Sequence, residues 1–333
     1  MIALLVRRKT IYSWLAKTTL NRFLMQLITD TTSFISPADT VVTIGTFDGI
    51  HIGHQKIIKQ VVEMAKRNQL LPTVLTFFPH PRMVLKPSES IQLLQTIEER
   101  AFLMENYGIE QLVIQPFDKE FASLTAEQYV KDILMKKLRA TIIIIGYDHR
   151  FGRQRAAGIE ELKEFGKRYH FQVIEIPVQE VEAVSVSSTK VRKALLSGDI
   201  KEANHYLGYP FSFSGEVIHG QKLGRTLGYP TANIQIETPY KIVPKIGVYI
   251  VYSFIQGCKV FGMLSIGKNP TIEGKGESIE VYFFDFNGDL YGQQLHIYFV
   301  DYLREEVKFS SIEALKEQLQ KDEVEARKRI RKE

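Results

Sequence analysis

The chain has 333 residues, about twice the length of a typical domain, which predicts two separate hydrophobic cores. Hydrophobic residues make up 44% of the sequence and charged residues 24%, an ordinary balance for a globular protein that excludes global disorder. The single cysteine, Cys258, excludes an internal disulfide framework and a multi-cysteine zinc site, and it predicts a reducing compartment, the cytoplasm.

The net charge of +5 arises in residues 1–24, which contain five basic residues and no acidic residue. From Met25 onward the two signs balance, so we expect no nucleic-acid partner. The apolar run 1–6 is too short to span a membrane, so we expect no membrane partner either. We interpret residues 1–24 as an extension outside the fold, with an organelle transit peptide as the alternative. The sequence leaves the oligomeric state open.

Short apolar runs alternate with stretches of helical periodicity as far as residue 186. The expected strands are 41–46, 73–77, 111–114, 141–145 and 171–176, and the expected helices are 54–69, 96–107, 126–138, 159–169 and 189–206. Because the runs are apolar without alternation, they predict strands that are buried on both faces of a parallel sheet. Residues 25–207 are therefore expected to form a Rossmann-like α/β domain with helices on both faces of its sheet.

The first predicted strand ends in a glycine-rich turn, GTFDGIHIGH at residues 45–54, and a helix follows. This order places backbone N–H groups and the positive end of a helix where a phosphate can bind. His51 and His54 are three residues apart, so both imidazoles can face one pocket and stabilise charge during phosphoryl or nucleotidyl transfer. There are two alternatives: the His-x-x-His pair could occur by chance on the surface, or it could be half of a zinc site. No further cluster of zinc ligands lies nearby in the sequence.

A second anion site is expected where Ser188 and Thr189 open a helix with Arg192 one turn further on. Hydroxyls, backbone amides and a guanidinium would all reach the same anion there. A helix N-cap is the alternative role for Ser188.

From residue 211 onward, strands follow one another without intervening helices, which predicts a β-barrel or sandwich in residues 208–333. The expected strands are 247–255, 259–266, 278–284 and 294–300, and a charged helix over 311–330 ends the chain. Asn287 and Gly288 lie between apolar runs and predict a hairpin turn. Residues 262–268 have the glycine and lysine spacing of a P-loop, but Asn269 and Pro270 follow, so we exclude this interpretation.

The barrel half carries a second group of residues suited to a nucleotide. Gly220 and Gly224 would let a loop approach a ligand closely. Thr231 and Asn233 are two residues apart, so both side chains can bind one Mg-nucleotide. Glu280 heads an alternating strand and can face the mouth of the barrel; a solvated surface carboxylate is the alternative.

These segments, in this order, resemble the prokaryotic bifunctional riboflavin kinase/FMN adenylyltransferase (FAD synthetase) family. The segments that carry the resemblance are 45–54, 76–81, 146–152, 187–192, 230–233 and 280–292, and the likeness extends from about Met25 to the C-terminus. The resemblance implies a nucleotidyltransferase domain followed by a closed β-barrel of riboflavin kinase type with a terminal helix. It also implies phosphorylation of riboflavin to FMN and adenylylation of FMN to FAD, with ATP as co-substrate and Mg²⁺ as cofactor.

The resemblance implies roles for residues of the first domain. His51 and His54 would contact the ATP phosphates as catalytic residues, and Ser188, Thr189 and Arg192 would hold the pyrophosphate. Further residues of this ATP site would be Gly45, Phe47, Asp48, Gly49, Gly53 and Asp148. Pro79 and His80 would either shape a loop over the site or contact the flavin. His149 stands where the family usually has an aromatic residue.

In the barrel, the resemblance implies that Thr231 ligates Mg²⁺ and that Asn233, with the loop glycines Gly220 and Gly224, binds the nucleotide phosphates. Glu280 would be the general base for the riboflavin 5′-hydroxyl, and Arg304 would lie close to the flavin.

Two other functions are alternatives to this one. They are a nucleotidyltransferase for another phosphorylated metabolite and a flavin- or RNA-binding module without catalysis.

Overall fold

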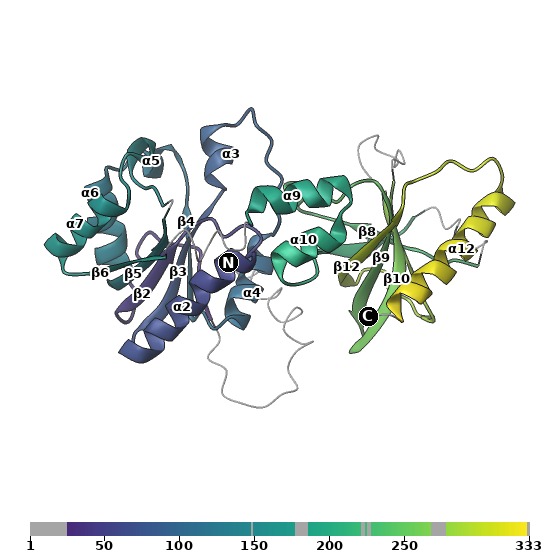
Figure 1. Ribbon diagram of the computed structural model, residues 1–333, viewed down its shortest axis with the longest axis horizontal. Helices are drawn as coiled ribbons and strands as arrows, with labels where there is room; N and C mark the ends of the chain where they lie inside the picture. Colours follow the sequence, from purple (N-terminus) through teal and green to yellow (C-terminus); the bar gives the residue numbers. More distant parts are fainter. Residues whose placement is uncertain are drawn as a thin grey trace.

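The computed structural model describes residues 25–147, 149–176, 186–220, 224, 228–267 and 278–331. The expectations for residues 1–24, for Asp148 and for the turn at 268–270 lie outside the described residues. Figure 1 shows a sheet-and-helix unit at one end of the molecule and a barrel at the other, with two helices, α9 and α10, between them.

Six parallel strands form the N-terminal sheet in the order β1-β4-β3-β2-β5-β6. They are β1 (Gln26–Ile28), β2 (Thr40–Ile44), β3 (Leu71–Phe78), β4 (Gln111–Pro116), β5 (Ala140–Gly146) and β6 (Gln172–Ile176). The chain runs outward from β2 through β3 and β4, then returns to the other side of β2 with β5 and β6. Ligands of open α/β sheets bind at such a reversal, outside the carboxyl ends of the strands, which here are the ends of β2 and β5.

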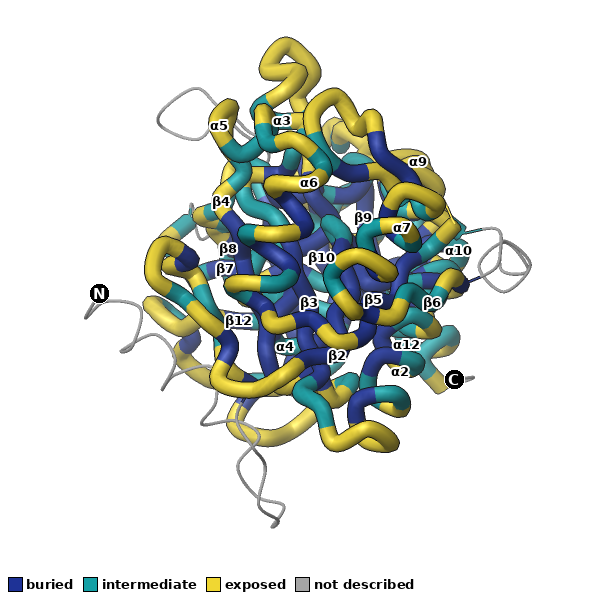
Figure 2. The backbone as a smooth tube through the Cα atoms, turned by 90° about the vertical axis from the view of Figure 1, so that its left-hand side faces the viewer, coloured by how far each residue is buried: buried dark blue, intermediate teal, exposed yellow. Residues whose placement is uncertain are grey.

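The central strands of the sheet are buried on both faces, as the unalternating apolar runs predict, whereas only Ile176 is buried in the edge strand β6. Every residue of β2 is buried, and Figure 2 shows this strand in dark blue. Val41 packs with helices α2 (Ile52–Asn68) and α4 (Ile97–Asn106), whereas the adjacent Val42 packs with residues 129–138 and with α7 (Ile159–Tyr169). Helices therefore cover both faces, which confirms the predicted fold class. The shorter helices are α3 (Pro81–Leu85), α5 (Lys119–Ala122), α6 (Ala126–Gln128) and the 3₁₀ helix η2 (Arg153–Arg155).

Two predicted helices differ in detail. The helix expected over 126–138 is α6 followed directly by a π-helix, η1 (Tyr129–Lys137). The stretch expected over 189–206 is two helices, α9 (Ser188–Ser197) and α10 (Ile200–Leu207). The break has a local cause: Gly198, at a φ of 84°, ends α9 in the left-handed conformation, and Asp199 caps the start of α10.

Six antiparallel strands close the C-terminal barrel in the order β10-β11-β8-β7-β12-β9. They are β7 (Ser212–Ile218), β8 (Ala232–Gln235), β9 (Gly247–Ile255), β10 (Cys258–Gly267), β11 (Ser278–Phe283) and β12 (Gln294–Arg304). The terminal helix α12 (Ile312–Ile330) lies against the barrel (Figure 1), which confirms the predicted barrel and its helix. Buried side chains of α9 and α10 belong to the same hydrophobic core as the barrel interior.

The hairpin expected at Asn287 and Gly288 is wrong. Strand β11 pairs with β10 and β8, and strand β12 pairs with β7 and β9, so residues 284–293 connect two strands that are not neighbours. Turn propensity is local and cannot report that other strands occupy both edges of each strand. A tight hairpin does occur between β9 and β10, where Gln256 and Gly257 both have positive φ angles.

Candidate active sites

A cavity of about 1180 Å³ lies at the carboxyl ends of β2 and β5. All four sequence segments singled out in the N-terminal domain contribute to its lining. The predicted site residues that line it are Gly45, Phe47, Asp48, His51, Gly53, His54, His80, Ser188, Thr189 and Arg192. Gly49 and Pro79 are not among the lining residues, although each is adjacent in sequence to one that is. Segments more than 100 residues apart in the sequence therefore meet in one concave site.

The two histidines lie together at the start of α2. His51 is the N-cap residue, and its Nδ1 accepts a hydrogen bond from the backbone N–H of His54 at 3.4 Å. The rings stack with their centroids 3.7 Å apart and their planes inclined by 16°. The Nδ1 atom of His54 is buried and has no hydrogen-bond partner among the described residues. A buried polar atom of this kind in a cavity is available to a ligand.

Burial decides the charge of this pair. It lowers the pKa of His51 to about 4, against the opposing attraction of Asp48. It also lowers the pKa of His54, and repulsion from His51 and Arg100 acts in the same direction. Both imidazoles are therefore neutral at neutral pH and can donate hydrogen bonds without carrying charge.

Asp48 faces the cavity, but protein groups occupy its carboxylate. The side chain is 1% exposed and accepts hydrogen bonds from the backbone N–H groups of Leu94 at 2.9 Å and Gln95 at 3.2 Å. It pairs with the guanidinium of Arg192, and the buried Arg100 lies 3.7 Å away. The geometry makes Asp48 an anchor for Arg192.

The N-terminus of α9 carries the second group of predicted anion-binding residues. Ser187 is the N-cap and accepts a hydrogen bond from the backbone of Lys190, so the cap is not Ser188. Ser188 donates its hydroxyl proton to the carbonyl oxygen of Asp48 at 2.7 Å. Thr189 is exposed at the helix N-terminus, beside Arg192 on the cavity wall. This end of α9 thus offers a hydroxyl, free backbone N–H groups and a guanidinium to an anion.

Gly49 shapes the turn between the strand and α2. Its φ angle is 89°, and a β-carbon there would lie 2.4 Å from Cδ1 of the buried Leu94. Its N–H donates to Oε1 of Gln95 at 3.2 Å. The turn needs a glycine here for backbone conformation and for space.

Aromatic side chains line another part of the cavity: Phe117, Phe121, Tyr129 and Phe151. Only Phe151 lies in a segment that the sequence analysis singled out, and the other three were missed. Tyr129 begins the π-helix and is 4% exposed, and its hydroxyl has no hydrogen-bond partner among the described residues. Burial raises the pKa of Tyr129, so the hydroxyl keeps its proton. The spacing of Phe117 and Phe121 directly after a predicted strand was the available sequence clue, whereas a π-helix has no comparable pattern.

The barrel holds a second cluster of predicted residues, on β8 and β11. Glu280 pairs in register with Asn233 across the two strands. The hydroxyl of Thr231 donates to Oε2 of Glu280 at 2.9 Å. Gly220 abuts the same group, because a β-carbon there would lie 2.1 Å from Nδ2 of Asn233, and one on Gly224 would lie 3.4 Å from Cγ2 of Thr231. Residues from three separate segments therefore form one cluster, in which Thr231 contacts the carboxylate of Glu280.

Arg304 is engaged elsewhere. Its guanidinium forms a two-point ion pair with Asp322 of α12, with Nη2 and Nε at 2.7 and 2.8 Å from Oδ2, and it lies over the ring of Phe309. These partners belong to α12 and to the segment before it, not to β8 or β11. Arg304 thus fastens the terminal helix to the barrel.

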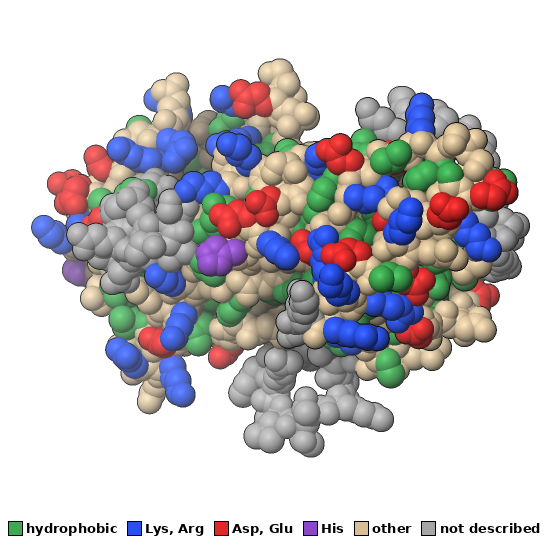
Figure 3. Space-filling model, turned by 45° about the vertical axis from the view of Figure 1, so that its right-hand side comes forward, with side chains coloured by type: hydrophobic (Ala, Val, Ile, Leu, Met, Phe, Trp, Pro, Cys, Tyr) green, Lys and Arg blue, Asp and Glu red, His purple; other side chains and the backbone are tan. Residues whose placement is uncertain are grey.

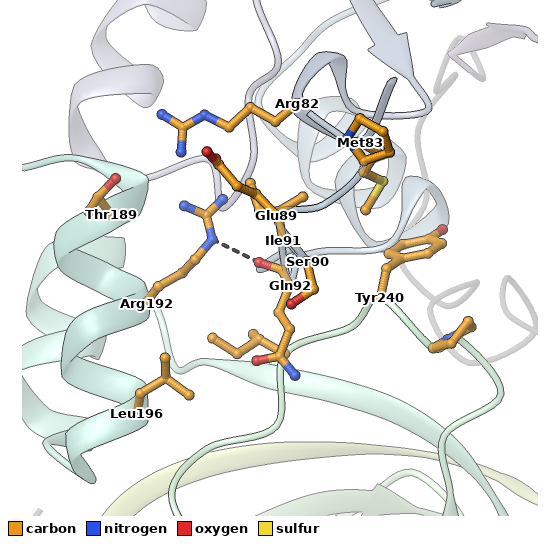
Figure 4. A pocket seen from close by; sticks show the side chains of 13 residues that line it. Arg82, Met83, Glu89, Ser90, Ile91, Gln92, Thr189, Arg192, Leu196 and Tyr240 are labelled. Carbon is orange, nitrogen blue, oxygen red and sulfur yellow. Dashed lines mark hydrogen bonds between the residues drawn. The ribbon is translucent and has the colours of Figure 1, made fainter. Parts of the chain in front are cut away.

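A smaller cavity of about 640 Å³ lies where the two domains meet. Figure 4 shows Arg82 and Gln92 from the segment around α3, Arg192 from α9, and Tyr240 from the connection between β8 and β9 around it. Arg192 also lines the larger cavity, so the two spaces share a wall.

Paired imidazoles and a helix start at the reversal of a parallel sheet are typical of a nucleotide-dependent transferase, and here that domain is joined to a closed barrel with a Thr–Glu–Asn cluster. The comparisons with known proteins give the family. Residues 34–190 match the family model for FAD synthetase, and residues 207–330 match the model for riboflavin kinase.

Named relatives cover nearly the whole chain. A bifunctional riboflavin kinase/FMN adenylyltransferase of Buchnera aphidicola from Schizaphis graminum is 40% identical over 290 residues, 86% of this chain and 92% of the relative. One of Listeria monocytogenes is 36% identical, over 89% of this chain and 94% of the relative. The chain belongs to the bifunctional riboflavin kinase/FMN adenylyltransferase family, with the FAD synthetase domain first and the flavokinase domain second. The family predicted from the motifs is confirmed.

A solved structure shares the fold of the full chain. A crystal structure from Streptococcus pneumoniae, described as a macrolide-efflux protein, superposes with a TM-score of 0.83 at 36% identity. The match covers 91% of this chain and 99% of that one.

In the part of this chain that the structure describes, no helix has the length and apolar character needed to cross a membrane.

Proposed function

We propose that the two sites catalyse successive steps. In the barrel, the 5′-hydroxyl of riboflavin attacks the γ-phosphorus of ATP, which gives FMN and ADP. In the N-terminal domain, the phosphate of FMN attacks the α-phosphorus of a second ATP, which gives FAD and pyrophosphate. The observation that carries this division is the separation of the predicted catalytic and binding residues into two clusters, one at the sheet and one on β8 and β11.

For adenylylation, His51 and His54 would donate hydrogen bonds to the ATP phosphates as negative charge redistributes in the transition state. Ser188, Thr189 and Arg192 would hold the departing pyrophosphate at the N-terminus of α9. The aromatic wall that includes Tyr129 would pack against the flavin ring and offer it a buried hydroxyl. Pro79 and His80 would shape the loop beside it.

For phosphorylation, Glu280 would accept the proton of the riboflavin hydroxyl as general base. The residues beside it fit Mg²⁺, because the hydroxyl of Thr231, the amide of Asn233 and the carboxylate are hard oxygen donors. The described residues contain no group of three or more His, Cys, Asp and Glu side chains that could hold a metal ion. Water and ATP phosphates would therefore complete the coordination, and Mg²⁺ would neutralise phosphate charge.

The proposal predicts that the two activities can be removed independently. Glu280→Gln should lower FMN formation from riboflavin at least 100-fold and leave FAD formation from supplied FMN within twofold. His51→Asn combined with His54→Asn should do the reverse. The measurement is incubation with ATP and Mg²⁺ followed by chromatographic separation of the flavins. Loss of both activities from either change would contradict the assignment.

The same assay separates the rival functions. FAD formed from FMN, with no FMN formed from riboflavin, would leave an adenylyltransferase whose barrel only binds. No conversion of either flavin would favour a binding module. We expect the protein to act in the cytoplasm on small molecules. Figure 3 shows Lys and Arg side chains interspersed with Asp and Glu over the face in view.

A further inference from the structure

Residues 92–95, which precede α4, connect the adenylyltransferase site to the barrel domain. The connection is made first through the backbone. The N–H of Leu93 donates to the carbonyl of Tyr240 at 2.6 Å, and the N–H of Ile242 donates to the carbonyl of Leu93 at 2.9 Å. These residues form a short parallel bridge between Leu93 and Lys241, which lies between β8 and β9. The barrel domain thus holds one edge of a segment that belongs to the other domain.

Lys241 is buried at this junction, with a 1% exposed side chain. Its ammonium group pairs with the carboxylate of Glu99 at the start of α4 and donates to the carbonyl of Leu94 at 2.7 Å. The ammonium also lies 5.0 Å from the centre of the Phe211 ring. A buried lysine is rare unless it is paired, so these partners account for its position.

The contact of Lys241 continues to the phosphate site through one peptide group. The carbonyl of Leu94, which accepts from Lys241, and the N–H of Gln95 belong to the same peptide unit. That N–H donates to Oδ1 of Asp48, whose Oδ2 is bound by Arg192. In a buried setting each hydrogen bond of such a series strengthens the next by polarisation. The ammonium in the barrel domain therefore supports the orientation of the guanidinium in the cavity.

Arg192 receives a second fixed contact from the same segment. Its Nε donates to the carbonyl of Gln92 at 2.8 Å, the dashed line in Figure 4. Residues on both sides of Leu93 therefore hold Arg192, one directly and one through Asp48. Any shift of this segment away from the barrel would move both supports together.

Tyr209 of the barrel side acts on the same turn. Its hydroxyl donates to the carbonyl of Gly49 at 2.5 Å and accepts from Nε2 of Gln95 at 2.9 Å. It thus joins the glycine-rich turn to the segment that Lys241 holds, and it is a second point at which this turn depends on the barrel domain.

We infer that Lys241 is a positioning residue of the adenylyltransferase reaction: through the Leu94–Gln95 peptide and Asp48 it fixes Arg192, and the barrel domain thereby completes the pyrophosphate site. This inference rests on the proposed role of Arg192. It adds a residue from the kinase domain to the reaction of the other domain.

The test is a comparison of full-length variants in both reactions. Lys241→Met should weaken binding of inorganic pyrophosphate at least tenfold, measured as product inhibition of FAD formation and by titration calorimetry. The rate of riboflavin phosphorylation should stay within twofold. Lys245→Met is the matched control, because Lys245 lies on the same connection but pairs with the exposed Glu305. It should change neither reaction.

Lys241→Met also leaves the carboxylate of Glu99 buried without its partner, which can prevent folding. The double variant Glu99→Gln/Lys241→Met removes both charges and should restore the thermal midpoint. It still lacks the donor to Leu94, so pyrophosphate binding should remain at least fivefold weaker than in the wild type. Tyr209→Phe, which removes one hydroxyl, should raise the KM for ATP two- to fivefold with an unchanged kinase rate.

The outcomes separate this inference from the proposed function. If Arg192→Ala leaves pyrophosphate binding unchanged, the role proposed for Arg192 is wrong. If Arg192→Ala weakens binding while a folded Lys241 variant binds pyrophosphate like the wild type, the inference is overturned and the proposed function stands. Equal losses in both reactions, in proportion to the folded fraction, would show that Lys241 only stabilises the fold.

Discussion

The paired imidazoles of His51 and His54 are neutral in the free protein because burial lowers the pKa of both, and at His51 it outweighs the attraction of Asp48. Burial likewise lowers the pKa of His80, another histidine on the cavity wall, to about 4. The positive charge of the cavity wall therefore comes from Arg and Lys side chains, such as Arg192, and not from the imidazoles. Buried neutral histidines also make the folded domain sensitive to acid.

This sensitivity predicts a pH-dependent stability. The unfolded chain binds a proton at His51 near pH 6.5 and the folded chain only near pH 4, so lowering the pH from 7 to 5 favours unfolding. The expected loss from this residue is about 2 kcal/mol of unfolding free energy. His51→Asn keeps a side chain able to cap α2 and should reduce the loss by that amount. Denaturant titrations at the two pH values, with the exposed His170→Asn as control, measure it.

A single β-carbon at Gly49 should be enough to disturb the adenylyltransferase site. Gly49→Ala adds strain at a positive φ angle and a clash with the buried Leu94, together about 3 kcal/mol. The matched control is Gly257→Ala, which has a similar φ angle but no neighbour within 4 Å of the new carbon. It should lower stability by about 1 kcal/mol. Equal losses from the two changes would show that space at Gly49 is unimportant.

At the level of elements, the ion pair between Arg304 and Asp322 attaches α12 to the barrel. Removal of either partner leaves the charge of the other largely buried and without an ion-pair partner. Arg304→Met and Asp322→Ala should therefore each lower the free energy of unfolding by about 3 kcal/mol. The double variant should lose less than the sum by at least 1 kcal/mol. Guanidinium denaturation of the four proteins gives this coupling. If the stability losses of the two single variants simply add in the double variant, Arg304 does not hold the helix, and a direct flavin contact is favoured.

Most elements could be predicted from the sequence because their cause is local. The run 141–145, four isoleucines after a threonine, predicts a buried strand because β-branched residues favour strands, and α7 spans the residues that its periodicity predicts. Strand β1 has only three residues, none of them buried, and gives no such pattern. The hairpin at Asn287 failed because strand pairing is decided by the closed barrel and not by the turn.

The candidate sites were predictable as residue types but not as contacts. The glycine-rich turn gave both histidines their place at the start of α2. Nothing near Asp48 in the sequence indicates that Arg100 and Arg192 share its carboxylate, because their meeting depends on the tertiary fold. Tyr129 was missed for a similar reason: a π-helix changes which side chains face the cavity.

On the scale of the whole molecule, the barrel depends on helices that precede it in the sequence. Six buried apolar side chains of α9 and α10 complete its core: Val191, Ala194, Leu195, Ile200, Ala203 and Leu207. A fragment 187–333 should therefore be more stable than a fragment 208–333, by on the order of 5 kcal/mol. Thermal and denaturant unfolding of the two fragments test this, and equal stabilities would support the boundary predicted at residue 207.

Residues 191–206 fall between the ranges that match the two family models, yet they contain most of α9 and α10. They connect the two halves of the enzyme, because Arg192 lines the cavity at the sheet and the buried side chains of both helices pack in the barrel core. In a chimera that exchanges one catalytic half between relatives, the side chains of residues 191–206 would no longer match the residues they pack against. This segment and its contact residues in both domains would have to be transferred together. Catalytic halves of this enzyme are therefore less interchangeable than a two-domain diagram implies.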